Sequence, residues 1–288
     1  MIKKIIILFK LARKIAKSDI LNIVTKFQEP PLAIKFFFKM LSISFFTKNK
    51  IDLNKNEGQR LSDSLESMGT TFIKLGQFLA TRPDIIGENL SKQLENLQDK
   101  LPPFPLVQAK EIIKNDLGED TYNSIVNISE PVAAASIAQV HKAQINDKGT
   151  LKDVAIKILR PNIKKIFNDE IDAMMLFAFL IESFAKKTKR LKLVEVVFLL
   201  KEITNLEMDL RFEAAAANEY AENTKNDVGF RVPQIYWNFT SENVMTLDWV
   251  DGISIRETDK LKERKLNTEK IANDIIQNFL RHAVRDGF

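Results

Sequence analysis

A loop of small residues followed by two short apolar runs constrains the fold of this chain most strongly. The loop lies in Val-Ala-Ala-Ala-Ser-Ile-Ala-Gln-Val at residues 132–140. Strands are predicted at 140–145 and 153–159, on either side of a turn sequence at 146–149. The second strand contains Val-Ala-Ile-Lys, which ends at Lys157. This arrangement predicts two neighbouring strands joined by a short turn, with a tight loop before the first one.

A small-residue loop, a strand and Val-Ala-Ile-Lys are typical of the nucleotide-binding lobe of protein kinases. Kinases use glycines in this loop, so that the backbone can close over the phosphates. Here the loop contains Ala133, Ala134, Ala135 and Ser136, and no glycine. Because alanine avoids positive φ, we expect a stiffer loop of different shape. Lys157 is expected to reach the nucleotide phosphates; the alternative is an edge lysine whose apolar stem lies along the strand.

A phosphate-binding lysine of this kind requires a carboxylate partner on a helix. The candidates are Glu207, Asp209 and Glu213, in a segment predicted to be helical. Asp209 and Glu213 are four residues apart and would share one helix face, whereas Glu207 is turned from that face by more than about 90°. We therefore expect Glu207 and Glu213 to have different partners.

The chain divides by pattern into four parts. These are a basic amphipathic arm (1–50), a helical segment (51–128), a mixed segment (129–252) and a final helical segment (253–288). The predicted helices are 61–79, 89–99, 107–117, 163–185, 193–223 and 268–285, and further strands are predicted at 231–237 and 243–248. The helix at 61–79 rests on the periodic residues Leu61, Leu65, Met68, Phe72, Leu75 and Leu79.

Other features of the sequence limit its chemistry. The chain has no cysteine, which excludes disulfides, thiolate metal sites and cysteine nucleophiles. Its two histidines, His141 and His282, are far apart and lack neighbours at ligand spacing, so we predict no metal site. No apolar run reaches the roughly 18–20 residues that span a bilayer, and no secretory signal is recognisable.

The amino-terminal arm is strongly basic. Residues 1–50 contain eleven Lys and Arg against two acidic residues, together with apolar clusters. This composition predicts association with an anionic membrane surface rather than with nucleic acid. The alternative is a solvated pair of amphipathic helices.

The segments described above, taken together, resemble the UbiB family, also called the aarF-domain kinases. Residues 72–84 resemble its hallmark Lys-x-Gly-Gln helix, here Lys74, Gly76 and Gln77, and residues 97–105 resemble the element that follows. From spacing alone Lys74 and Gln77 would be surface residues; the resemblance makes them site residues. It extends from about residue 55 to the end.

The resemblance implies an α+β fold, in which a helical amino-terminal extension packs on a kinase-like nucleotide lobe and blocks protein substrates. It implies that Glu207 pairs with Lys74 and Glu213 with Lys157, and that Asp209 completes the Glu-x-Asp motif. It implies ATP or ADP binding, with the strand after 243 leading to an adenine-binding hinge. The expected cofactor-binding residues are Val132, Ala133, Ala134, Ala135, Ser136, Ile137, Ala138, Gln139, Val140, Lys157, Glu213, Asp248 and Val250.

The sequence departs from the family pattern at its end. It stops at Phe288, before the catalytic loop and the metal-binding aspartate of the second lobe, so that the carboxy-terminal lobe is expected to be truncated. No catalytic residue and no metal ligand is therefore assigned in this chain, and the Mg²⁺ ligands are expected chiefly in the missing lobe. The chain by itself is expected to be inactive.

For the intact protein, the resemblance implies an atypical kinase or ATPase that supports ubiquinone biosynthesis at the cytoplasmic face of the bacterial inner membrane. Its expected partners are anionic lipid, quinone-biosynthesis proteins or lipid intermediates, and a second copy of itself in a homodimer. The alternative is a non-catalytic membrane-surface scaffold or a lipid-binding chaperone for quinone-biosynthesis enzymes. A conventional protein kinase is disfavoured by the alanine loop.

Overall fold

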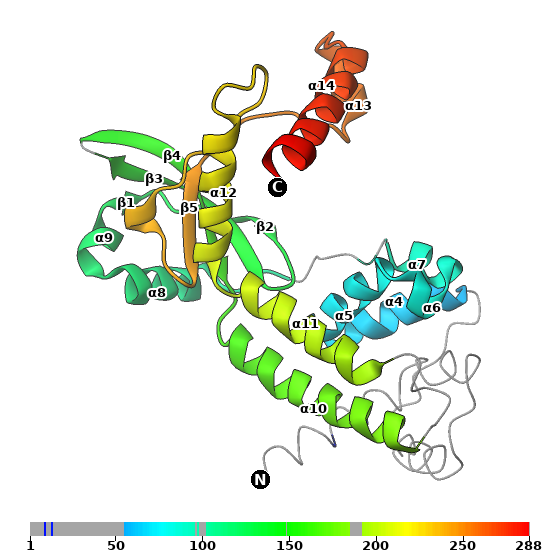
Figure 1. Ribbon diagram of the computed structural model, residues 1–288. Coiled ribbons are helices and arrows are strands. Elements are labelled where there is room, and N and C mark those ends of the chain that lie inside the picture. The colour runs from blue at the N-terminus through cyan, green and yellow to red at the C-terminus, as the bar shows by residue number, and fades with distance from the viewer. Residues whose placement is uncertain are drawn as a thin grey trace. The chain divides into compact units, whose positions relative to one another are not determined.

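The computed structural model describes Phe9, Arg13 and residues 55–95, 97, 102–147, 149–184 and 192–287 (Figure 1). The predictions for nearly all of the arm at 1–50, and for residues 98–101 of the element at 97–105, therefore concern residues outside the described ones. The described residues form two compact units. The helical unit contains the residues up to Pro102, Ala134–Ile137 and Arg160–Met208. The sheet unit contains Pro103–Ala133, Ala138–Leu159 and the residues from Asp209 onward.

Helices make up nearly all of the described secondary structure of the helical unit. They are α4 (Glu57–Met68), α5 (Thr70–Ala80), α6 (Pro83–Ile86), α7 (Glu88–Leu94), α10 (Ile163–Phe184) and α11 (Leu193–Glu207). Asn56 starts α4 with a capping box, in which its side chain accepts from the Gln59 N–H and the Gln59 side chain accepts from the Asn56 N–H. None of the helices within the described residues is long and apolar enough to span a membrane.

The single helix predicted at 61–79 is wrong, because Gly69 divides it into α4 and α5. Gly69 has a φ of +107°, which glycine adopts readily and which helix geometry excludes. Leu61, Leu65 and Phe72 are buried as predicted, whereas Leu75 and Leu79 are only partly buried. The break therefore changes which residues of α5 face the core.

The sheet unit contains a five-stranded sheet. Its strands are β1 (Ile125–Val126), β2 (Pro131–Ala134), β3 (Ala138–Asp147), β4 (Thr150–Leu159) and β5 (Val244–Asp248). The sheet order is β1-β3-β4-β5, with β2 also paired to β3. The helices of the unit are α8 (Leu106–Leu117), α9 (Glu119–Asn123), α12 (Leu210–Thr224), α13 (Thr258–Glu263) and α14 (Thr268–Arg281). A short π-helix at His282–Asp286 follows α14.

The core of the sheet unit lies between α8 and one face of the sheet. It consists of buried side chains from both, including Ala109 and Ile113 of α8 and Val154, Ile156 and Ile158 of β4. Alternate residues of β4 point to this core, so Ala155 and Lys157 point to the opposite face. Burial of each large aliphatic side chain contributes about 1.5–3 kcal/mol, which makes the register of β4 strongly preferred.

The helix predicted at 193–223 is also interrupted. Its first part, α11, ends at Glu207, and Asp209 has extended backbone angles and caps α12 by accepting from the Arg211 N–H. The strand predicted at 231–237 is wrong: only Ile235 forms an isolated bridge, to Leu247. Pro233 has no N–H to donate to a sheet ladder, which explains why pairing does not extend there.

The end of α14 is attached to α12 by a cluster around His282. The Tyr220 hydroxyl is hydrogen-bonded to His282 Nδ1, and the Phe230 ring packs edge-on against both side chains. Arg285 donates to both carboxylate oxygens of Asp227, at 2.8 and 2.9 Å, and these hydrogen bonds lower the pKa of Asp227. The cluster therefore joins the last described helix to the helix that carries Glu213.

The architecture is α+β, as predicted, with an antiparallel sheet and separate helices. The compact units differ from the four-part division of the sequence. Residues Arg160–Met208 associate with the helices at 57–94, and α8 associates with the sheet. Asp116 of α8 explains the second association, because it accepts from the Ser241 hydroxyl at 2.7 Å and from the Asn243 N–H at 3.2 Å.

Candidate functional site

Lys157 and Glu213 form an ion pair on the face of the sheet opposite the α8 core. Lys157 Nζ lies 2.7 Å from each carboxylate oxygen of Glu213. The side chains are 25% and 48% exposed, so both remain accessible to solvent. The predicted contact between these two residues is therefore present, and α12 is the helix that supplies the carboxylate.

Apolar side chains surround Lys157 on the same face. In the strand register, Lys157 lies between Val140 of β3 and Met245 of β5, and Ala155 lies beside Leu247. Directly opposed residues of antiparallel strands share a face. We call Val140, Ala155, Met245 and Leu247 the apolar platform. Sequence reasoning selected only Val140 of this set; the period of two along β4 and β5 would have found the other three.

Asp248, a predicted cofactor-binding residue, is hydrogen-bonded to the segment before β5. Its side chain accepts from the Tyr236 hydroxyl at 2.7 Å and from the Gln234 N–H at 3.2 Å. Its own N–H donates to the Gln234 carbonyl. Asp248 therefore fixes the segment before β5. Val250, the other predicted hinge residue, is exposed to solvent, with 54% of its surface accessible.

The alanine loop joins β2 to β3. Val132, Ala133 and Ala134 belong to β2, Ala135 to Ile137 form the link, and Ala138 begins β3. Every described non-glycine residue with positive φ lies outside this loop. The loop thus has no residue with positive φ, the conformation that alanine disfavours, as its composition predicts.

Gln139 was predicted to contact the cofactor, but its side chain is completely buried. Its Oε1 accepts from the Phe104 N–H at 2.9 Å, and its Nε2 donates to the Phe104 carbonyl and to His141 Nε2. His141 Nδ1 in turn donates to the Ser129 carbonyl at 2.8 Å. Gln139 therefore holds Phe104 against β3, and we assign it a structural position rather than a binding one.

Burial lowers the pKa of His141 below its ordinary value of 6.5, and the hydrogen bond to the Ser129 carbonyl opposes this effect. The neighbouring amide adds to the preference for the neutral ring. Because Gln139 Nε2 is a donor, His141 Nε2 must accept, and a second proton there would bring two donors together.

In the helical unit, Lys74 of α5 meets Glu207 of α11. Lys74 Nζ lies 2.8 Å from Glu207 Oε2, and the two side chains are 15% and 39% exposed. The different partners predicted for Glu207 and Glu213 are therefore observed. The stated reason was incorrect, since Glu207 and Glu213 lie on separate helices rather than on two faces of one helix.

The structure also places the other motif residues. Gly76 is buried on α5, where a Cβ would lie 2.8 Å from Leu65 Cδ1 and 3.0 Å from Leu97 Cδ1. Gln77, next along α5, is partly buried. Asp209 accepts from the Arg211 side chain at 2.7 and 2.9 Å, besides capping α12. Asp209 and Glu213 therefore do not share a helix face.

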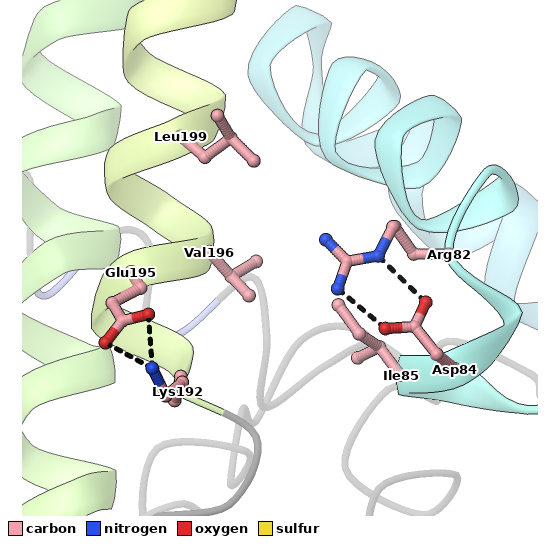
Figure 2. Close-up of a pocket in the computed structure, with 7 residues that line it drawn as sticks. All are labelled: Arg82, Asp84, Ile85, Lys192, Glu195, Val196 and Leu199. Atoms are coloured by element: carbon pink, nitrogen blue, oxygen red, sulfur yellow. Dashed lines mark hydrogen bonds and ion pairs between the residues drawn. The ribbon is translucent and has the colours of Figure 1, made fainter.

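A pocket of about 370 Å³ opens between the end of α5, α6 and the start of α11 (Figure 2). Its charged residues pair with each other: Arg82 with Asp84, and Lys192 with Glu195. The remaining lining residues are the aliphatic Ile85, Val196 and Leu199. The pocket contains none of the predicted site residues, and its charges are already neutralised. Across the described part of the chain, no three His, Asp or Glu side chains converge as a metal site would require.

Comparison with known proteins agrees with this geometry. The model of the ABC1 atypical kinase-like domain matches residues 96–288. A protein of Marinobacter nauticus, named "Probable protein kinase UbiB", is 34% identical over 261 residues, which cover 90% of this chain and 46% of the relative. Proteins of the same name from Pseudomonas paraeruginosa and Pseudomonas aeruginosa are 28% identical over 282 residues, which cover 98% of this chain and 52% of each relative.

The chain spans about half the length of the curated relatives it matches. The family match covers the alanine loop, the Lys157–Glu213 pair and Glu207, all of which lie within residues 96–288. The described residues have the α+β fold expected of a kinase-like domain, and the Lys157–Glu213 pair lies on its sheet. The chain belongs to the ABC1 atypical kinase-like family.

Proposed function

We propose that this chain binds ATP or ADP on the sheet unit, as the nucleotide-binding part of an atypical kinase or ATPase. The observation that supports this most strongly is the Lys157–Glu213 pair, which holds a lysine ammonium in place on an open face of the sheet. An ammonium held extended by a carboxylate is suited to the α- and β-phosphates.

The apolar side chains around Lys157 are suited to the adenine base of the nucleotide. The apolar platform offers Val140, Ala155, Met245 and Leu247 beside the lysine, a surface on which a planar adenine ring would stack. Backbone groups near Val250 would bind the edge of the base. A few polar groups beside an apolar surface are the usual composition of a small-molecule site.

ATP would supply the transferable phosphoryl group, and Mg²⁺ would neutralise the phosphate charge when bound. We propose that its ligands come chiefly from the half of the relatives that this chain does not span. The chain itself should then bind nucleotide without turning it over, because positioning and metal-borne charge provide nearly all of such catalysis.

We propose ubiquinone biosynthesis as the setting of the intact protein, because the sequence resembles the UbiB family and its relatives carry the name UbiB. The basic residues at 1–50 favour a location on an anionic membrane surface, the cytoplasmic face of the bacterial inner membrane. Partners of this kind of protein would be quinone-biosynthesis enzymes or their lipid intermediates, and a second copy of the chain.

One observation favours the alternative of a scaffold or lipid-binding chaperone. Helix α11 has two apolar faces: Val197 and Leu200 are buried on one, while Leu199, Ile203 and Leu206 are exposed on the other. An exposed apolar stripe of this kind is a feature of surfaces that bind partners. The stripe and nucleotide binding are compatible, so turnover distinguishes the two functions.

The test is ATP turnover with and without anionic vesicles, measured on this chain and on a version extended to the length of the relatives. We expect Lys157-dependent turnover in the extended protein only. Turnover by the 288-residue chain that disappears in Lys157→Met would contradict the proposed division of roles. An extended protein that binds nucleotide yet never turns it over would favour the scaffold.

A further inference from the structure

Three consecutive carbonyl groups of the alanine loop are held by hydrogen bonds from two residues. The Ala135 carbonyl accepts from Arg160 Nε at 3.0 Å and from Arg160 Nη2 at 2.8 Å. The Ser136 carbonyl accepts from the Thr70 hydroxyl at 3.2 Å. The Ile137 carbonyl accepts from the Arg160 N–H at 2.8 Å. We call Arg160 and Thr70 the carbonyl clamp.

Both members of the clamp are themselves firmly placed. Arg160 directly follows the last residue of β4, and its Nη1 donates to the Pro102 carbonyl at 2.9 Å. Thr70 is the first residue of α5, one turn before Lys74. These contacts explain why Ala134–Ile137 belongs to the helical unit, although the strands on both sides of it belong to the sheet unit.

The clamp determines more than the direction of three carbonyls. A trans peptide group is planar, so its N–H points opposite to its C=O. Fixing the carbonyls of Ala135, Ser136 and Ile137 therefore also fixes the N–H groups of Ser136, Ile137 and Ala138. Successive backbone N–H groups held in a fixed arrangement are the feature by which loops bind phosphates.

We propose that Arg160 and Thr70 are positioning residues, which hold the alanine loop in one conformation and thereby set the affinity for nucleotide. This inference depends on the proposed nucleotide-binding function. Neither residue is required to touch the nucleotide. Arg160 places a rigid, planar fork on two different carbonyls, Ala135 and Pro102, which the single ammonium of a lysine does not reproduce.

Sequence reasoning missed both residues. Arg160-Pro161 reads as the end of a strand, and Thr70 reads as an ordinary residue within the helix predicted at 61–79. Their role is visible only through contacts that span 25 and 66 positions of the chain.

The test uses the 288-residue chain with four variants: Thr70→Val, Thr70→Ser, Arg160→Lys and Arg160→Ala. Thr70→Val keeps the shape of the side chain but removes the hydroxyl that donates to the Ser136 carbonyl, while Thr70→Ser keeps that hydroxyl. Two matched controls remove similar groups elsewhere: Thr81→Val at the other end of α5, and Arg285→Lys in the forked pair with Asp227. Each protein is measured by hydrogen exchange of backbone amides, by titration calorimetry with ADP and by thermal unfolding.

We expect faster exchange at residues 136–138 in Thr70→Val, Arg160→Lys and Arg160→Ala, with unchanged exchange in β3 and β4. We expect ADP affinity to fall about five- to tenfold, the effect of losing one or two hydrogen bonds that pre-organise a loop. Thr70→Ser and both controls should match the parent. Rescue by serine separates positioning from a general loss of stability.

The outcomes separate this inference from the function on which it depends. If the parent binds ADP through Lys157, but Thr70→Val and Arg160→Lys equal it in affinity and loop exchange, the clamp has no positioning role and the inference is wrong. If the parent binds no nucleotide, the proposed function is wrong, and the inference that the clamp sets nucleotide affinity is wrong as well. Should Arg160→Ala fail to fold, the pair Thr70→Val and Thr70→Ser still decides.

Discussion

Lys157 of β4 and Glu213 of α12 form an ion pair in which the lysine Nζ lies 2.7 Å from both carboxylate oxygens. A second pair, Lys74 with Glu207, lies within the helical unit at 2.8 Å. The boundary between the units falls between Met208 and Asp209, only one residue after Glu207. Each unit therefore contains its own lysine–glutamate pair, and the Glu-x-Asp motif contributes to both units.

His141 should make the sheet unit less stable in mild acid. Its pKa is lowered by burial, so the unfolded chain takes up a proton at a higher pH than the folded one. Stability is then full above the ordinary pKa of 6.5 and falls as pH decreases through the interval below it, by at most about 1.4 kcal/mol per pH unit for one proton.

Urea unfolding between pH 7.5 and 5 checks this prediction, with His141→Asn as the comparison. The variant is expected to be less stable at neutral pH but to lose less stability on acidification. Parallel pH profiles for the parent and the variant would show that His141 does not carry the effect.

A side chain at Gly76 is expected to destabilise the helical unit. An alanine Cβ would lie 2.8 Å from Leu65 Cδ1 and 3.0 Å from Leu97 Cδ1, and such overpacking costs about 1–3 kcal/mol. Alanine regains about 1 kcal/mol through its higher helix propensity. We therefore expect Gly76→Ala to lower the free energy of unfolding by about 1 kcal/mol, and Gly76→Val to lower it further.

The companion variant Leu65→Val tests the stated cause. If Leu65 is the group that is crowded, Gly76→Ala should cost less in the Leu65→Val background than in the parent. Equal or increased stability of Gly76→Ala in the parent would refute the close-packing account.

Ala135→Gly is expected to alter nucleotide binding. Glycine enlarges the accessible backbone conformations by an amount that corresponds to about 0.5–1 kcal/mol, and it allows positive φ, which no residue of this loop adopts. Either the affinity or the preference between ADP and ATP should change in titration calorimetry. Unchanged affinities for both nucleotides would mean that the alanine loop does not tune binding.

The arm at 1–50 is expected to bind anionic membranes. It contains eleven basic residues against two acidic ones, and each basic residue near an anionic surface contributes about 1 kcal/mol. Co-sedimentation should show binding to anionic vesicles that weakens with added salt and disappears when residues 1–50 are deleted. Equal binding to neutral and anionic vesicles, or no loss in the deletion, would support a solvated helix pair instead.

Local patterns predicted part of this structure because they depend on neighbouring residues. Apolar alternation located β3 and β4. The need of Lys157 for a carboxylate gave three candidates, Glu207, Asp209 and Glu213, and the family resemblance selected Glu213. The break at Gly69 was missed, since a glycine inside a periodic run does not reveal the sign of its φ. The break at Asp209 was missed for a similar reason, because an aspartate can cap a helix or lie within one.

Long-range contacts explain the remaining differences. Gln139 was expected to bind the cofactor, but the backbone of Phe104, 35 positions away, forms hydrogen bonds with its amide, and the side chain is buried. Asp116 attaches α8 to the segment before β5 through Ser241 and Asn243, more than a hundred positions later. Such pairs leave no local periodicity, and only the folded chain shows them.

The central claim, that Lys157 is the nucleotide-binding lysine of this chain, is tested most directly by titration calorimetry with ADP and ATP. The parent should bind, and Lys157→Met should bind at least about tenfold more weakly, the loss expected for removing one charge-assisted contact to phosphate. The matched control is Lys152→Met, which removes a lysine from the same strand that pairs with Asp147 at 2.7 Å. The account predicts that Lys152→Met binds like the parent, whereas equal binding by Lys157→Met, or none by the parent, would contradict it.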